Sequence, residues 1–429
     1  MTLVAALLFL TFIAGMGVGV PIAVAIFISC FVVLIFQGLP ITLLAHQMLT
    51  AIDSYTLIAI PGFMLIGTLM EKSGLVERLV EFSMAVIGWI RGGLSFVAMI
   101  ATVIFAGISG SGTADTAAVG SVMIPALQKD KYDSSYAAAV VASGGSIGII
   151  IPPSIPMIIY GITTNTSIPA LFIGGYIPGL LLAFGLMVYM YFVARREGYG
   201  RVQKFSVSFL WRSVYRAFWA LLVPIVIVGG IVTGLVTPTE AAIIGVMYIL
   251  AIDFFVYRGL TYKDLVSSFT EAAVLSGVIM FLMATSCTFG WIMARENIPE
   301  MMVNGILSIT SNKIFILFSL NVLLLILGCL MDTVAILVIL TPLLMPIGEK
   351  FGIDPVHYGV FIVFNLSIGL LTPPVGYALF VASSLAKTSV EKVTKAIMPL
   401  LYIKIFILLL ITYFPVFTMF LPNIWRSLR

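Results

Sequence analysis

The chain carries the same short motif twice. Residues 146–153 read SIGIIIPP and residues 367–374 read SIGLLTPP. Each copy follows a second shared segment, DTAAVGSVMIPAL beginning at Asp115 and DTVAILVILTPLL beginning at Asp332. Two motifs in the same order and with similar spacing indicate an internal duplication. Each half of the chain is therefore expected to build the same structural unit.

The composition places both units in a lipid bilayer. Hydrophobic residues make up 61% of the 429 residues and charged residues only 9%, which is too little charge for the surface of a soluble domain. No polar tract is long enough for a separate extramembrane domain, so we expect one all-α polytopic unit. The net charge of +4 is better explained by basic cytoplasmic loops than by nucleic-acid binding, and we expect no nucleic-acid partner.

Polar interruptions of apolar stretches predict two unusual elements in each half. Residues 94–127 contain ISGSGTADT between two apolar segments, which favours a re-entrant helical hairpin. The next stretch, 135–164, is interrupted by IPPSIP. Because proline removes a backbone donor and restricts the residue before it, this transmembrane helix must unwind there. The second half repeats the pattern, with a hairpin at 314–347 and a broken helix at 357–386.

Other stretches predict ordinary spans and interfacial helices. Residues 3–36 are long enough for two short helices that turn at GMGVGVP, or for one kinked helix. Residues 71–91 alternate charged and apolar residues at near-helical spacing, as expected for an arm along the membrane interface. Residues 297–312 occupy the corresponding place in the second half. Further spans are predicted at 55–70, 170–193, 217–236, 240–257, 265–294 and 397–421.

The basic segment 195–216 orients the chain, because clustered arginine and lysine residues predict a cytoplasmic loop. Counted from this loop, the first hairpin opens to the cytoplasm. An odd number of crossings then places the second hairpin on the other face. Inverted repeats with broken helices are typical of secondary transporters that bind near the midplane. The predicted division is 1–70 N-terminal scaffold spans, 71–93 interfacial arm, 94–164 first half of the transport domain, 165–294 scaffold spans with the basic loop, 295–312 second arm, 313–386 second half of the transport domain and 387–429 C-terminal span.

Polar groups are expected to meet where each hairpin tip faces a broken helix. Half-helix C-termini and unwound carbonyls suit a small cation such as Na⁺, whereas half-helix N-termini suit an anion, so we expect one cation site per half. The candidate ion and substrate residues are Ser109, Ser111, Thr113, Asp115, Thr116, Ser146, Gly148, Pro152, Pro153, Gly328, Asp332, Thr333, Ser367, Gly369, Thr372, Pro373 and Pro374, with Na⁺ sites proposed at Ser109, Gly148, Gly328 and Thr372.

Three acidic residues are singled out. A carboxylate within a membrane segment costs at least ~2.5 kcal/mol on insertion scales, so Asp115 and Asp332 are candidates for ion coupling. Capping of a half-helix N-terminus is the alternative for both, and the two roles are compatible. Glu240 follows Pro238 in GLVTPTEAA, which favours a place in the first turn of a helix capped by a threonine, with a lining role as the alternative.

The chain resembles the large membrane subunit (DctM type) of tripartite ATP-independent periplasmic (TRAP) transporters. Five ordered segments carry the resemblance: GSGTADTAAVGSVMIPAL, SIGIIIPPSIPMIIYG, GLVTPTEAA, MDTVAILVILTPLLMPI and SIGLLTPPVGYALFV. The resemblance covers essentially the whole chain. The family's ion and substrate positions correspond here to 109–116 with 146–153 and to 328–333 with 367–374.

The resemblance implies a function, a mechanism and partners. The protein would be the translocating subunit of a transporter that imports an organic acid, such as a C4-dicarboxylate or sialate, with Na⁺ as the coupling ion. An elevator-like transport domain would move against a scaffold in a bacterial inner membrane. The implied partners are a small four-helix membrane subunit, a periplasmic substrate-binding protein and membrane lipids. The protein would not be an enzyme.

Other classes of function explain the pattern less well. A stand-alone ion-coupled anion carrier of the same superfamily, working without a binding protein, is the first alternative. Neighbouring genes for a binding protein and a small subunit would discriminate against it. An intramembrane enzyme would need a nucleophile with its base, or metal ligands, within reach, and the chain has two isolated histidines and few buried acids. A channel is disfavoured because inverted broken repeats imply alternating access.

Overall fold

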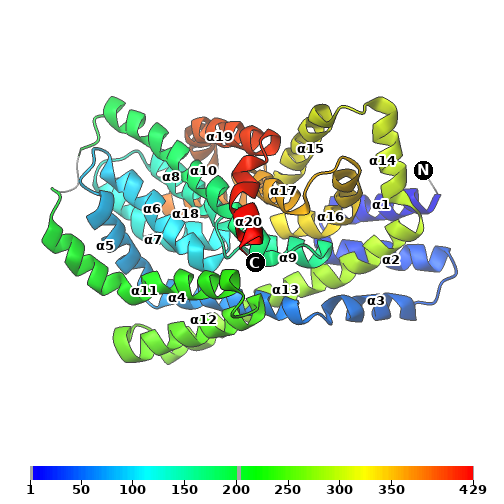
Figure 1. Ribbon diagram of the computed structural model, residues 1–429, viewed down its shortest axis with the longest axis horizontal. Helices are drawn as coiled ribbons and strands as arrows, with labels where there is room; N and C mark the ends of the chain where they lie inside the picture. Colours follow the sequence, from blue (N-terminus) through cyan, green and yellow to red (C-terminus); the bar gives the residue numbers. More distant parts are fainter. Residues whose placement is uncertain (1–2, 201–203, 429) are drawn as a thin grey trace.

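The computed structural model describes residues 3–200 and 204–428, and all regular structure in these ranges is helical (Figure 1). Six helices of the described chain are long and apolar enough to cross a membrane. The chain is therefore a multi-pass membrane protein. The six helices are α10 (Ile168–Arg196), α11 (Val207–Thr233), α12 with its π-helical continuation η3 (Pro238–Ile252 and Asp253–Tyr257), α13 (Tyr262–Arg295), α16 (Thr333–Lys350) and α19 (Val390–Tyr413).

The N-terminal apolar stretch forms two short helices, the first of the two predicted arrangements. They are α1 (Leu3–Gly17) and α2 (Ile22–Phe36), and they pack against each other. Gly19 takes a positive φ of 86° in the turn between them. The Ser29 hydroxyl of α2 donates to the Leu8 carbonyl of α1 at 2.6 Å and so satisfies a polar group inside an apolar pair.

Both halves contain the predicted helical hairpin followed by a broken helix. In the first half these are α6 (Gly93–Ser109), α7 (Gly112–Lys129), α8 (Ser134–Gly145), η2 (Ser146–Ile149) and α9 (Ile155–Thr164). In the second half they are α15 (Lys313–Gly328), α16, α17 (Pro355–Gly369) and α18 (Tyr377–Ala386). The two units interlock, because α18 packs on α7 and α8 while α16 packs on α9. The opposite orientation of the two units stays a prediction.

A separate group of helices faces these units. The bent pair α3 (Thr42–Ile52) and α4 (Ala59–Lys72), joined by η1 (Tyr55–Ile58), changes direction by 64°. Helices α4, α12 and α13 run side by side along the lower part of Figure 1, and α4 packs on both of the others. Thr237 caps α12 and Glu240 lies in its first turn, as predicted. The Glu240 carboxylate accepts from Thr237 N at 2.7 Å, and Glu240 N donates to the Thr237 hydroxyl at 3.3 Å.

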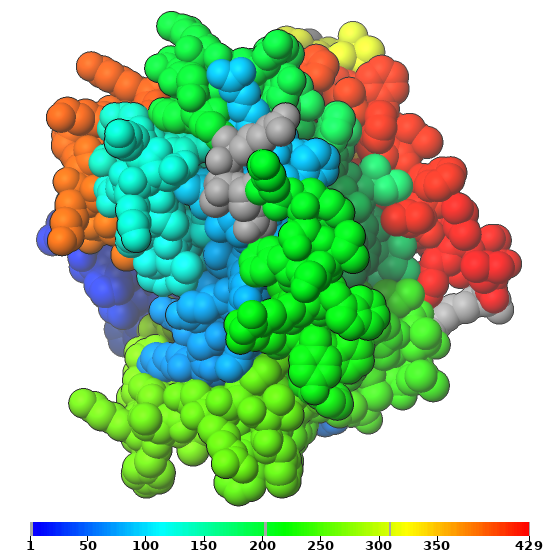
Figure 2. All heavy atoms as spheres, turned by 90° about the vertical axis from the view of Figure 1, so that its left-hand side faces the viewer, coloured from blue at the N-terminus to red at the C-terminus, as the bar shows by residue number. Residues whose placement is uncertain are grey.

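The two predicted arms are shorter than expected. The first is α5 (Leu75–Ile87), which packs on α6 and α11, and Figure 2 shows its blue surface beside the green start of α11. Glu71 and Lys72 were predicted to open this arm, but they form the last turn of α4, so that boundary was wrong. The second arm is α14 (Ile298–Ile309), which packs on α13 and α16.

The structure corrects two further boundaries. Much of the basic segment 195–216 is helical, because α10 extends to Arg196 and α11 begins at Val207; residues 201–203 of this segment lie outside the described ranges. The predicted last span, 397–421, was wrong at both ends. Helix α19 ends at Tyr413, and after a break at Pro415 a separate helix, α20 (Val416–Ser427), packs on α10. Proline cannot donate to the preceding turn, which explains the break.

Candidate substrate and ion site

The first hairpin tip lies directly on the first broken helix. Helix α6 ends at Ser109, Gly110 takes the left-handed conformation with φ 67°, and α7 begins at Gly112. The Gly110 carbonyl accepts from Ile155 N at 3.3 Å. A Cβ at Gly110 would lie 2.7 Å from the Pro153 carbonyl oxygen. The glycine is needed here for both its φ and its close approach.

Asp115 is buried at this tip and is not an N-cap. It lies in the first turn of α7, whose N-cap is Ser111, and the Ser109 hydroxyl across the tip donates to its Oδ1. Its Oδ2 has no hydrogen-bond partner among the described residues, and a Cβ at Gly148 would collide with it. The capping alternative is thus wrong for Asp115. A buried carboxylate oxygen without a partner is expected to bind a cation or a proton.

Two predicted hydroxyls near Asp115 face the backbone of their own helices. The Thr116 hydroxyl donates to the Gly112 carbonyl at 2.8 Å, and the Ser146 hydroxyl donates to the Ser143 carbonyl at 2.9 Å. The Ser146 hydroxyl also accepts from the fully buried Nζ of Lys404 in α19. The Ser146 hydroxyl therefore joins the end of α8 to α19, whereas the Thr116 hydroxyl bonds within α7.

The first break has its own hydrogen-bonding residue. The Pro152–Pro153 peptide bond is cis, and the chain resumes as α9 after Ser154. The Ser154 hydroxyl donates to the Ile149 carbonyl at 2.6 Å and accepts from Met157 N at 3.3 Å. One side chain thus caps the second half-helix and satisfies a carbonyl freed by the break.

The second tip makes the corresponding contact with the second break. Helix α15 ends at Gly328, and a Cβ at Gly369 would lie 2.6 Å from the Gly328 carbonyl carbon. Only glycine permits this approach. Asp332 is the N-cap of α16, and its side chain accepts from Val334 N at 2.9 Å. The capping prediction is therefore confirmed for Asp332.

Two further predicted residues of the second half, Ser367 and Thr372, bond to backbone carbonyls of the preceding turn. The Thr372 hydroxyl donates to the Ile368 carbonyl at 2.8 Å, and the Ser367 hydroxyl donates to the Phe364 carbonyl at 2.6 Å. Pro373 and Pro374 are joined by a cis bond, as in the first half. The proposed Na⁺ site at Gly328 and Thr372 stays a prediction.

One cavity of about 470 Å³ lies where the two tips face α4 and α13. Five predicted residues line it: Ser109, Ser111, Thr113, Asp332 and Thr333. The other predicted residues lie outside its lining: Asp115, Thr116, Ser146, Gly148, Pro152, Pro153, Gly328, Ser367, Gly369, Thr372, Pro373 and Pro374. The predicted set is therefore divided between residues that line the cavity and residues, such as the buried Asp115, that do not.

Three helix N-termini border this cavity. Thr113 belongs to the first turn of α7, Ile155 and Pro156 begin α9, and Thr333 begins α16. The positive end of the helix dipole makes such termini favourable for anions. The first turn of α7 has no side-chain cap among the described residues, whereas Ser154 caps α9 and Asp332 caps α16. The Ser111 and Thr113 hydroxyls, 3.4 Å apart, add donors at the same place. The arrangement suits a negatively charged group.

Sequence reasoning missed the opposite wall of the cavity. It comes from α4, with Thr68 and Glu71, and from α13, with Glu271. The sequence pattern places Glu71 in the arm and gives Glu271 no role inside its long apolar span. An acidic residue inside an apolar helix was the available signal for Glu271.

Comparison with known proteins shows the family to which the chain is similar. The family model described as the DctM component of the tripartite ATP-independent periplasmic transporter matches residues 7–417. The chain is 39% identical to the sialic acid TRAP transporter large permease protein SiaM of Vibrio cholerae over 96% of both chains. It is 38% identical to the C4-dicarboxylate TRAP transporter large permease protein DctM of Pseudomonas aeruginosa, over 91% of this chain and 92% of that protein.

The chain is also similar to a longer permease protein and to a transporter of known structure. The chain is 42% identical to the isethionate TRAP transporter permease protein DctMQ of Oleidesulfovibrio alaskensis, over 94% of this chain but 64% of that longer protein. The crystal structure of the YdaH transporter of Alcanivorax borkumensis has the same fold, with a TM-score of 0.59, 16% identity and coverage of 90% of this chain and 87% of that one. Because the family model covers nearly its whole length, the chain belongs to the DctM component family of TRAP transporters.

Proposed function

We propose that this chain is the translocating subunit of a Na⁺-driven importer of an organic acid in a bacterial inner membrane. Its partners would be a small four-helix membrane subunit and a periplasmic substrate-binding protein. The observation that carries the proposal is the cavity between the two tips, bordered by the N-termini of α7, α9 and α16. The relatives are named for sialic acid, a C4-dicarboxylate and isethionate, which are all organic anions.

Asp115 supports the coupling to Na⁺. Its partnerless Oδ2 and the Ser109 hydroxyl are oxygen ligands, which hard cations such as Na⁺ prefer. A bound Na⁺ would neutralise the carboxylate beside the cavity. Binding of an organic anion to the adjacent N-termini would then become more favourable, because one negative charge near them is cancelled.

The packing supports an elevator-like movement. The two hairpin units interlock through the contacts of α18 with α7 and α8 and of α16 with α9. Across the cavity they face α4 and α13, which pack on each other. A cavity between two such bodies would change its access when one body slides along the other.

Uptake into proteoliposomes tests the proposal. The vesicles would contain this chain with its small membrane subunit, and labelled isethionate, sialate and succinate would be supplied with and without the binding protein. We expect uptake of one anion only with both an inward Na⁺ gradient and the binding protein. Uptake driven by Na⁺ alone would favour the stand-alone carrier, and the absence of uptake for every organic anion would contradict the proposal.

A further inference from the structure

The cavity has an unexpected charge for an anion site. Its described lining contains the carboxylates of Glu71, Glu271 and Asp332, and no lysine, arginine or histidine. Asp332 is held by the N-terminus of α16, which compensates its charge. Glu71 lies in the last turn of α4 and Glu271 in the interior of α13, so neither carboxylate caps a helix N-terminus. An organic anion at this wall would be repelled unless another group cancels part of the negative charge.

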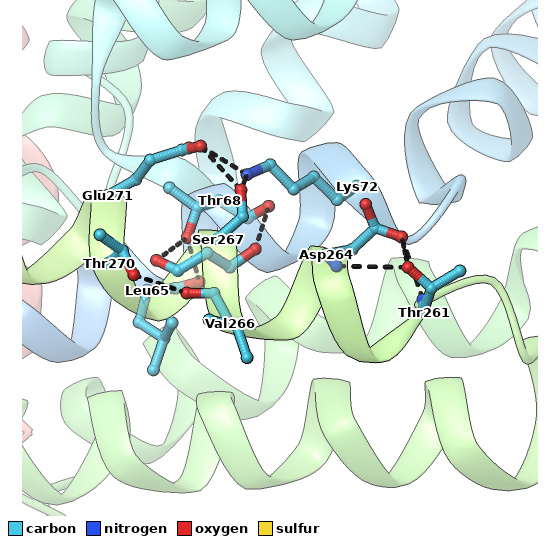
Figure 3. A network of polar contacts seen from close by, with 10 residues as sticks. Leu65, Thr68, Lys72, Thr261, Asp264, Val266, Ser267, Thr270 and Glu271 are labelled. Carbon is cyan, nitrogen blue, oxygen red and sulfur yellow. Dashed lines mark hydrogen bonds and ion pairs between the residues drawn. The ribbon is translucent and has the colours of Figure 1, made fainter.

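Lys72 is placed to cancel one of these charges. Its Nζ lies 2.6 Å from Glu271 Oε1 and donates to the Ser267 hydroxyl at 2.5 Å (Figure 3). The Ser267 hydroxyl in turn donates to the same Glu271 oxygen at 3.0 Å. Lys72 comes from α4 and both partners come from α13, so the ion pair joins the two helices of the wall. Among the described residues, Glu271 pairs with no other basic side chain.

The surroundings hold this pair in place. One turn earlier on α4, the Thr68 hydroxyl donates to the Ser268 carbonyl at 3.3 Å. The Ser268 hydroxyl reaches back to the Thr68 carbonyl at 3.5 Å. The Lys72 side chain is only 21% exposed, whereas that of Glu271 is 50% exposed. The ammonium group is therefore shielded and fixed, and the carboxylate is the member of the pair that faces the cavity.

We propose that Lys72 is a specificity-determining residue: its positive charge lowers the repulsion between the α4–α13 wall and an organic anion in the cavity. With Lys72 in place, the wall carries the net charge of one carboxylate rather than two. The inference rests on the proposed function, because it requires an anionic substrate. Loss of the ammonium group would double the negative charge of the wall, and the repulsion would grow with the charge of the substrate.

Three variants of the complete transporter test this role: Lys72→Met, Glu271→Gln and the double variant. For the anion that the wild type takes up, we expect Lys72→Met to raise KM at least tenfold with little change in kcat. The double variant restores neutrality and is expected to return KM to within about threefold of the wild type. Glu271→Gln alone leaves an unpaired ammonium group, which should lower KM and slow release of the anion.

The controls separate charge from structure. Lys263→Met removes an exposed positive charge from the first turn of α13, outside the cavity lining, and should leave KM within about twofold. Raising the ionic strength with choline chloride should shrink the defect of Lys72→Met at least threefold, which a purely structural defect would not do. Lys72→Arg keeps the charge and should keep a KM near that of the wild type.

If the wild type transports an anion in a Na⁺-dependent way, two results would overturn the inference alone. One is a KM of Lys72→Met equal to that of the wild type. The other is a KM of the double variant no lower than that of Lys72→Met. A wild type that takes up none of the organic anions would instead overturn the proposed function, and the inference with it. The two failures are therefore distinguishable in one set of measurements.

Discussion

Asp115 and Asp332 begin matching segments of the two halves, yet they have different surroundings. Asp332 caps α16 and accepts from Val334 N, so its position follows from the helix that it starts. Asp115 lies one turn inside α7, with one oxygen bonded to Ser109 and the other without a described partner. A shared sequence motif therefore carries a structural role in one half, while its counterpart keeps a free ligand atom. Of the two residues, Asp115 is the one with a buried oxygen that has no described partner and could bind an ion.

Substitution by asparagine separates the two roles. Asp115→Asn keeps an acceptor for Ser109 but removes the charge, so we expect at least a tenfold loss of Na⁺-dependent uptake with a normal amount of protein in the membrane. Asp332→Asn keeps a good N-cap and should retain uptake within about threefold, whereas Asp332→Ala loses the cap and should reduce uptake. Uptake of the anion is measured for each variant as a function of Na⁺ concentration and normalised to the amount of protein inserted in the membrane. Normal Na⁺ dependence in Asp115→Asn would move the ion site elsewhere.

At the scale of elements, the tip of each hairpin contacts the break of the next helix through glycine. Gly148 adjoins the Asp115 carboxylate, and Gly369 adjoins the Gly328 backbone. We expect Gly148→Ala and Gly369→Ala each to lower uptake at least tenfold, because the added methyl group forces the tip from its break at a cost of about 1–3 kcal/mol. Gly229→Ala is the matched control, since a Cβ there meets nothing within 4 Å. Equal uptake by all three variants would contradict a role for this packing.

The elements differ in how far the sequence could predict them. Hairpins and broken helices were predictable because their signals are local: glycine and serine inside an apolar stretch, and consecutive prolines. The end of α4 also has a local signal, because Gly74 takes a positive φ of 69° directly after the C-cap Ser73. The α4–α13 wall of the cavity was not predictable, because Lys72 and Glu271 lie far apart in the sequence and meet only in the fold. A single sequence shows which residues are polar, but not which distant segment they face.

At the scale of the whole molecule, two interlocked hairpin units face α4 and α13 across the cavity. If the units move as one body during transport, the contact between α4 and the first tip must break and re-form. That contact is close, since a Cβ at Gly67 of α4 would lie 3.7 Å from the Cβ of Ser109. This separation lies within the range of disulfide-bonded cysteines. The pair therefore offers a way to lock the two bodies together.

Gly67→Cys combined with Ser109→Cys tests this movement in a background where Cys30, Cys287 and Cys329 are replaced by alanine. Oxidation should abolish uptake, because the disulfide prevents α4 and the tip from separating, and reduction should restore the activity of the reduced double variant. Each single variant should be insensitive to the oxidant, which separates cross-linking from damage to the Ser109 site. Mass spectrometry would verify the disulfide. Full uptake by the cross-linked protein would exclude relative movement of α4 and the first tip, and with it the elevator-like mechanism at this contact.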